Sequence, residues 1–85
     1  MARDIEFIWD LADDPEGNVH HVAEHDLTVD EVEDVVVNPT STGNSRSSGL
    51  PCVWGYTATG RYIIVVFEEL EADVVCVVTA YEVDE

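Results

Sequence analysis

The first hydrophobic pattern along the chain repeats every second residue. Ile5, Phe7 and Trp9 fall on one side of an extended backbone, and the residues between them fall on the other. This alternation is typical of a strand that buries one face, so we predict a strand from Ile5 to Trp9.

The next pattern has the spacing of a helix. Val19, Val22 and Ala23 share one face of a helix that we predict from Asn18 to His25. Residues 13–15 read Asp-Asp-Pro, which offers an N-cap and a helix-opening proline.

A second helix has a stronger start signal. Thr28 can cap its first turn while Glu31, three residues later, reaches back to the Thr28 amide, which is the capping-box arrangement. Leu27 and Val32 have the spacing of a hydrophobic staple across the same turn. The helix should end at Asn38, because Pro39 pushes the residue before it out of helical geometry.

Three apolar runs, 50–57, 61–68 and 73–83, follow a polar loop at 40–49 that we expect to lie outside any packed element. Their short connections predict an antiparallel meander. The order is therefore β-α-α-β-β-β: a single two-layer α+β domain, residues 1–85, with a four-stranded, mostly antiparallel sheet and two helices on one face.

The last two apolar runs do not alternate with polar residues, so both faces of these strands should be buried. Two helices in so short a chain can cover only one face of the sheet, and we expect another protein or a second copy to cover the other. The predicted interface residues are Ile63, Ile64, Val65, Val66, Phe67, Val75 and Val77.

The charge limits the partners. Nineteen Asp and Glu residues stand against three arginines and no lysine, for a formal net charge of −16. Nucleic-acid affinity depends on Lys and Arg that neutralise phosphates, so we expect no direct nucleic-acid binding. Two explanations of the acidity remain open: a cytoplasm of high salt, or an acidic face for a basic protein partner.

We also expect a cytoplasmic protein. No apolar stretch is long enough to cross a bilayer, and Met1 to Asp10 lacks the basic and apolar regions of a signal peptide. Cys52 and Cys76 sit singly in apolar runs without C-x-x-C spacing, which favours free thiols in a reducing compartment over a disulfide.

The run from Asn18 to Glu33 resembles the N-x-x-H-[IV]-x-x-H-x-[VL]-[ST]-x-x-E-[VI]-E segment of BrnT-like proteins, which belong to the RelE/ParE toxin superfamily. The segments Gly55-x-Thr57-x-x-Gly60-Arg61, Val65-Val66-Phe67 and Thr79-Ala80 are similar to that family in the same order, so the resemblance covers most of the chain. It implies the compact fold of bacterial type II toxins, whose active members cleave mRNA and are neutralised by an antitoxin.

The same resemblance implies three candidate catalytic residues, namely His25, Arg61 and Tyr81. Arg46 in the polar loop, which matches no family position, is a further cation that could take part in the chemistry. BrnT-like chains commonly carry Arg where this chain has Tyr81, and the acidic end at Glu85 replaces the usual basic tail. Most of the cationic stabilisation that a metal-free ribonuclease needs is therefore missing.

A metal site is the remaining chemical possibility. His21 and His25 stand four residues apart and share a helix face, and Asp10 or Asp26 could supply a carboxylate. Because such pairs are common by chance and the adjacent Glu of zinc proteases is absent, we expect no metal and no cofactor.

Three hypotheses follow, in order of preference. The first is a BrnT/RelE-like toxin-fold domain of a bacterial or archaeal toxin–antitoxin type system that is catalytically weakened and acts by protein–protein interaction, through an antitoxin-like partner or a homodimer. The second is an active ribonuclease toxin, and the third is a small metal-binding domain.

Overall fold

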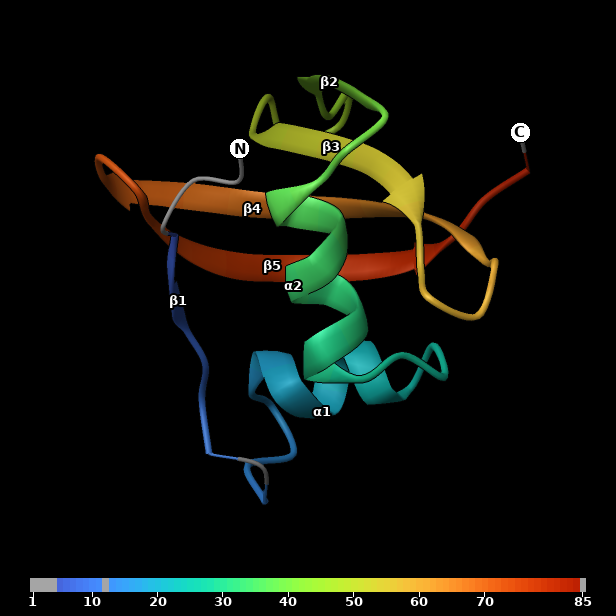
Figure 1. Ribbon diagram of the computed structural model, residues 1–85. Helices are drawn as coiled ribbons and strands as arrows, with labels where there is room; N and C mark the ends of the chain where they lie inside the picture. The colour runs from blue at the N-terminus through green and yellow to red at the C-terminus, as the bar shows by residue number, and fades with distance from the viewer. Residues whose placement is uncertain (1–4, 12, 85) are drawn as a thin grey trace.

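Two helices and five strands make up the computed structural model, which describes residues 5–11 and 13–84 (Figure 1). The elements are β1 Glu6–Ile8, α1 Asn18–Ala23, α2 Val29–Val37, β2 Ser41–Asn44, β3 Pro51–Tyr56, β4 Tyr62–Glu71 and β5 Val74–Glu82. Met1–Asp4, on which the signal-peptide expectation partly depends, and the acidic end at Glu85 lie outside the described residues. In the described part of the chain, neither helix has the length and apolar character needed to cross a membrane.

The sheet has the strand order β1-β5-β4-β3-β2. From β2 to β5, each strand pairs antiparallel with the next strand along the chain. β1 pairs parallel with β5, so the sheet is mixed. The α+β class, the element order of the six predicted elements and the antiparallel meander are confirmed, whereas the predicted strand count of four is wrong.

The additional strand is β2, inside the segment that we expected to remain an unpaired loop. Ser41 pairs with Trp54 and Asn44 with Pro51, which makes β2 an edge strand beside β3. Its Ser-Thr-Gly-Asn sequence has no apolar alternation because its side chains are mostly exposed, so the hydrophobic pattern carried no signal for it.

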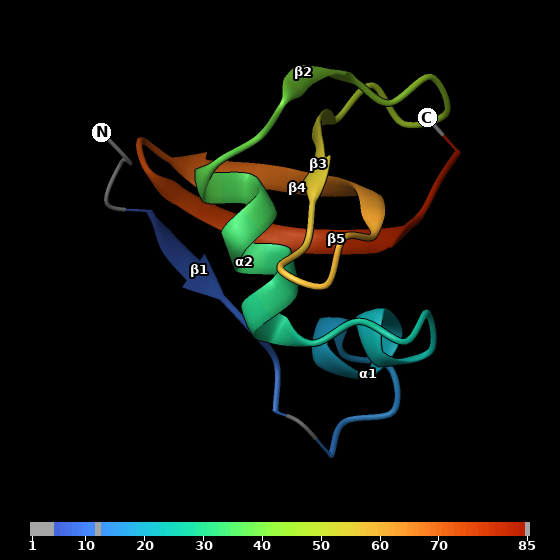
Figure 2. The same ribbon diagram turned by 45° about the vertical axis from the view of Figure 1, so that its right-hand side comes forward.

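Both helices cover one face of the sheet, as predicted: α1 packs on β5, and α2 packs on β3 and β4 (Figures 1 and 2). The core between the layers combines helix residues such as Val22 and Val32 with sheet residues such as Ile63, Val65 and Val77, all of which are at most 1% exposed. The face of β4 that carries Ile63 and Val65 is therefore the face under the helices.

The start of α2 follows the sequence prediction. The Thr28 hydroxyl accepts a hydrogen bond from the Glu31 amide, and the Glu31 carboxylate accepts one from the Thr28 amide. Both donors would otherwise be unpaired in the first turn. Leu27 and Val32, the predicted staple pair, are both buried in the core between the helices and the sheet.

The start of α1 differs from the prediction. Its N-cap is Gly17 and not one of the residues at 13–15. The Asp10 carboxylate accepts a hydrogen bond from the Asn18 amide, so a residue distant in sequence satisfies the first turn. A Cβ atom at position 17 would lie 2.7 Å from the Asp10 Cβ atom, which explains a glycine here. The helix ends at Ala23, two residues before the predicted His25, and Asp26 adopts a positive φ of 60°.

Candidate functional site

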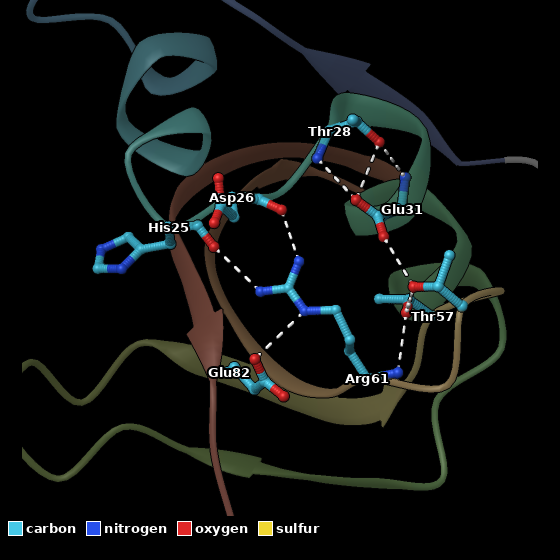
Figure 3. A network of polar contacts seen from close by, with 8 residues as sticks. His25, Asp26, Thr28, Glu31, Thr57, Arg61 and Glu82 are labelled. Carbon is cyan, nitrogen blue, oxygen red and sulfur yellow. Dashed lines mark hydrogen bonds and ion pairs between the residues drawn. The ribbon is translucent and has the colours of Figure 1, made fainter.

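Arg61 is the centre of the polar network at the end of the sheet where α1 and α2 meet (Figure 3). Its Nη1 donates to the Asp26 carbonyl, its Nη2 donates to the His25 carbonyl at 3.2 Å, and its Nε contacts the Glu82 carboxylate at 3.2 Å. Carbonyls just after a helix lack partners within the helix and are favourable positions for a cation. Arg61 therefore fastens the turn after α1 to the sheet.

The backbone of Arg61 continues this network towards α2. Its amide donates to the Thr57 hydroxyl at 3.1 Å, and the Thr57 hydroxyl lies 2.9 Å from that of Thr59. The Thr59 hydroxyl donates to the second carboxylate oxygen of Glu31, the residue that completes the capping box (Figure 3). One continuous set of hydrogen bonds thus connects the turn after α1, the β3–β4 turn and the first turn of α2.

His25 and Tyr81 lie side by side beyond this network. Their ring centroids are 5.9 Å apart, and the His21 and His25 ring centroids are 6.0 Å apart, so the His25 ring is next to both of the others. The structure therefore brings together the three candidate catalytic residues of the resemblance: Arg61 binds the His25 carbonyl, and the His25 ring contacts Tyr81.

The arrangement is limited as a catalytic site. In the part of the chain that the structure describes, no side-chain hydrogen bond joins His25 to Tyr81, whereas a base and the proton that it takes must be within about 3.2 Å. The Arg61 guanidinium is already shared among two carbonyls and the Glu82 carboxylate. A phosphate group would have to displace at least one of these partners to bind it.

Arg46 is separate from the Arg61 network. It lines a pocket of about 450 Å³ on the sheet face opposite the helices, together with Trp54, Ile64 and Tyr81. The β2–β3 turn that carries Arg46 thus reaches the same surface as Tyr81. Among the described residues, no hydrogen bond or ion pair involves the Arg46 side chain, in contrast to Arg61.

The residues considered for a metal do not converge. Asp10 binds the Asn18 amide and lies at the start of α1, while His25 follows its end. Within residues 5–11 and 13–84, no group of three or more His, Cys, Asp and Glu side chains has the geometry to hold a metal ion.

The predicted interface residues are placed differently from what the pattern indicated. Ile63, Val65, Val75 and Val77 are at most 1% exposed and lie in the core under the helices. Phe67 packs against that core and is half-buried.

The other predicted interface residues lie on the opposite face, where Ile64 and Val66 are only 8% and 6% exposed. They form a second small core with Cys52, covered by Leu50, Trp54 and Val83. The chain therefore buries this face with its own β2–β3 turn, Trp54 ring and C-terminal segment, so Ile64 and Val66 do not form an exposed apolar surface. The covering residues Leu50, Trp54 and Val83 belong to the predicted apolar runs 50–57 and 73–83, but the apolar pattern does not show which side chains pack over Ile64 and Val66.

Both cysteines are free thiols; Cys52 is buried and Cys76 half-buried. Burial raises the pKa of the Cys52 thiol. Burial also raises the pKa of the Cys76 thiol, and the negative charges of Asp10 and Glu68 raise it further. Both thiols therefore remain protonated near neutral pH and are poor nucleophiles.

Asn18 is a structural residue that the sequence pattern did not distinguish. Its side-chain amide nitrogen donates to the carbonyls of Ile8 and Val77, and its side-chain oxygen accepts from the Asp10 amide. A polar residue at the start of a helix is too common a signal to predict a partner 59 residues away.

Comparisons of the chain with models of protein families, with curated proteins and with solved structures found no match.

Proposed function

We propose that the chain is a BrnT/RelE-like toxin-fold domain of a bacterial or archaeal toxin–antitoxin type system, catalytically weakened and acting through protein–protein contacts in the cytoplasm. We infer the weakened activity from the contacts of the Arg61 side chain. All three of its side-chain nitrogens hold partners within the chain, and one partner is the carboxylate of Glu82. A cation committed in this way contributes little to stabilising the charge that develops on a scissile phosphate.

The overall charge supports the same proposal. With nineteen acidic residues against three arginines, the chain repels a polyanion at distances beyond any single contact. A protein partner with basic side chains is attracted by the same field, which raises its association rate.

The alternative is an active ribonuclease, and one observation favours it. Tyr81 contacts the His25 ring and also lines the same pocket as Arg46. An imidazole, a phenol and a cation around one surface are groups that can move protons and hold a phosphate.

Expression of the chain in a bacterial host separates the two functions. We expect no growth arrest and no cleavage of total RNA by the purified domain, at either moderate or high salt. Growth arrest that Arg46→Ala or Tyr81→Phe abolishes, in variants that retain the wild-type circular dichroism spectrum, would replace this proposal with the ribonuclease. As a matched control, Tyr56→Phe alters an exposed tyrosine on β3 that does not line the Arg46 pocket.

Partner binding has its own test. We expect the domain to co-purify, after co-expression, with the product of an adjacent gene that encodes a small antitoxin-like protein. A domain that arrests growth alone but not with that product would be an active toxin, whereas co-purification without any arrest supports the weakened form.

A further inference from the structure

An open groove of about 500 Å³ lies between the C-terminal end of α2 and the sheet. Val36 and Val37 of α2, with Pro39 just after the helix, form one wall, and Val53, Phe67 and Val75 form its floor on three adjacent strands. The volume is within the range of about 300–1,000 Å³ that is typical of binding pockets. It opens on the helix side of the sheet, whereas the pocket of Arg46 and Tyr81 opens on the other side, and Asn44 and Cys52 line both.

The groove exists because α2 is too short to cover the whole sheet. The helix ends at Val37, and Pro39 then directs the chain towards the edge strand β2 (Figure 2). The sheet continues past this point, since β4 extends to Glu71. Val37 and Phe67 are consequently only half-buried, and solvent reaches apolar side chains that a longer helix would have covered.

The rim of the groove is acidic. Glu69 is the one charged residue that lines it, and Glu71 and Asp73 follow in the β4–β5 hairpin at the same end of the sheet.

The described arginines lie elsewhere. Arg61 precedes the opposite end of β4, next to Tyr62, and Arg46 lines the pocket on the other face of the sheet. Among the described residues, the groove thus combines an apolar interior with a rim that carries only negative charge.

We propose that this groove binds an amphipathic basic segment of a protein partner, whose aliphatic side chains enter between α2 and the sheet and whose Lys and Arg side chains face the acidic rim. The inference rests on the proposed function, because it names the surface and the chemistry of the protein contact. A second copy of this chain is a poor occupant, since two chains of net charge −16 repel one another. A neutral apolar molecule would form no ion pair with the acidic rim.

The test uses a fluorescently labelled synthetic peptide of about 14 Leu and Lys residues, with Leu at helical i, i+3, i+4 and i+7 spacing. Its control has the same composition in an order that forms no apolar face. By fluorescence anisotropy, we expect the full chain to bind the patterned peptide at least about tenfold more tightly than the control peptide, a difference of about 1.4 kcal/mol.

Two pairs of variants locate the site. Thr42→Trp places a large ring in the groove from β2, whereas Ser41→Trp places the same ring on the other face of that strand, because successive strand residues point to opposite faces. We expect Thr42→Trp to weaken peptide binding about tenfold and Ser41→Trp to leave it within about twofold. Likewise, Glu69→Lys should weaken binding more than Glu24→Lys, which makes the same charge change on an exposed residue after α1.

Three results would overturn the proposal: equal binding of both peptides, which means attraction by charge alone; equal effects of Thr42→Trp and Ser41→Trp; or no peptide binding by a folded domain. These results are separate from those that decide the proposed function. Growth arrest or RNA cleavage would reject the weakened-toxin proposal even if the groove binds the peptide. If the groove does not bind the peptide and the chain causes neither growth arrest nor RNA cleavage, only the proposed binding surface is rejected.

Discussion

Asn18 and Asp10 hold each other through two reciprocal hydrogen bonds. The Asp10 amide donates to the Asn18 side-chain oxygen at 2.8 Å, and the Asn18 amide donates to the Asp10 carboxylate at 2.9 Å. The Asn18 side chain also donates to carbonyls of Ile8 and Val77, which connects the end of β1, the start of α1 and the middle of β5. Asn18 is only 7% exposed, so these bonds form largely out of water.

Replacing Asn18 should therefore be costly. Asn18→Ala leaves the buried carbonyl of Val77 and the partly buried amide of Asp10 without their partners, and an unpaired buried group costs about 1–3 kcal/mol. We expect the free energy of unfolding, measured by urea denaturation, to fall by about 2–4 kcal/mol. The control is Asn44→Ala, which removes one exposed hydrogen bond to the Gly49 carbonyl and should cost less than about 1 kcal/mol. A similar loss in both variants would contradict a structural role for Asn18.

The elements that sequence patterns predicted well are those whose stability is local. The capping box of Thr28 and Glu31 depends on residues within one turn, and the helix stop at Asn38 depends on the proline that follows it. Strand β2 was missed because its order comes from backbone pairing with β3, which leaves no trace in the apolar pattern. The N-cap of α1 was placed wrongly because the carboxylate that replaces it comes from Asp10, beyond the local turn.

The candidate site shows the same division. The resemblance identified His25, Arg61 and Tyr81, and the structure places them together. Neither their residue types nor their spacing in the sequence determines these contacts. The commitment of Arg61 to two backbone carbonyls could not be predicted, because carbonyl groups are the same in every residue. The acidic groove likewise depends on where α2 stops relative to the sheet.

A structural role for Arg61 predicts a stability effect that Arg46 does not share. Arg61→Lys keeps the charge but cannot reach both carbonyls and Glu82 together, because an ammonium lacks the planar, forked geometry of a guanidinium. The Arg61 side chain is 26% exposed, so we expect a moderate loss of about 1–2 kcal/mol in the free energy of unfolding.

Arg46→Lys serves as the matched control, since it makes the same change on an exposed turn residue and should alter stability by less than about 0.5 kcal/mol. Chemical denaturation of the two variants, side by side, measures the difference. Equal stability of Arg61→Lys and the wild type would mean that the guanidinium is free enough to bind a phosphate, which would strengthen the ribonuclease alternative.

The buried thiols predict a decline in stability at alkaline pH. Burial raises the pKa of Cys52 above its ordinary value of 9.0, so above pH 9 the unfolded chain releases this proton while the folded chain retains it. The unfolded state then binds fewer protons than the folded state, and the free energy of unfolding falls as pH rises.

The check is denaturation at a series of pH values from neutral to about 10.5, with Cys52→Ala as the reference. Cys52→Ala lowers stability at every pH because it removes buried volume, but its curve should fall less steeply above pH 9. Parallel curves for the two proteins would show that Cys52 does not contribute to the alkaline decline.

The cover over the second sheet face predicts when the chain will self-associate. Trp54 shields Ile64 and Val66, and Trp54→Ser should expose them and create an apolar patch. At moderate salt, the net charge of −16 opposes contact between copies, but at 1 M salt the screening length falls to about 3 Å and the repulsion weakens. We therefore expect Trp54→Ser to bind more of an apolar dye and to form dimers or larger species at high salt, as measured by sedimentation.

Tyr56→Ser is the control, because Tyr56 lies on the same strand but is already 45% exposed and does not belong to the cover. Equal self-association of the two folded variants would mean that the Trp54 ring does not prevent this face from binding other copies of the chain.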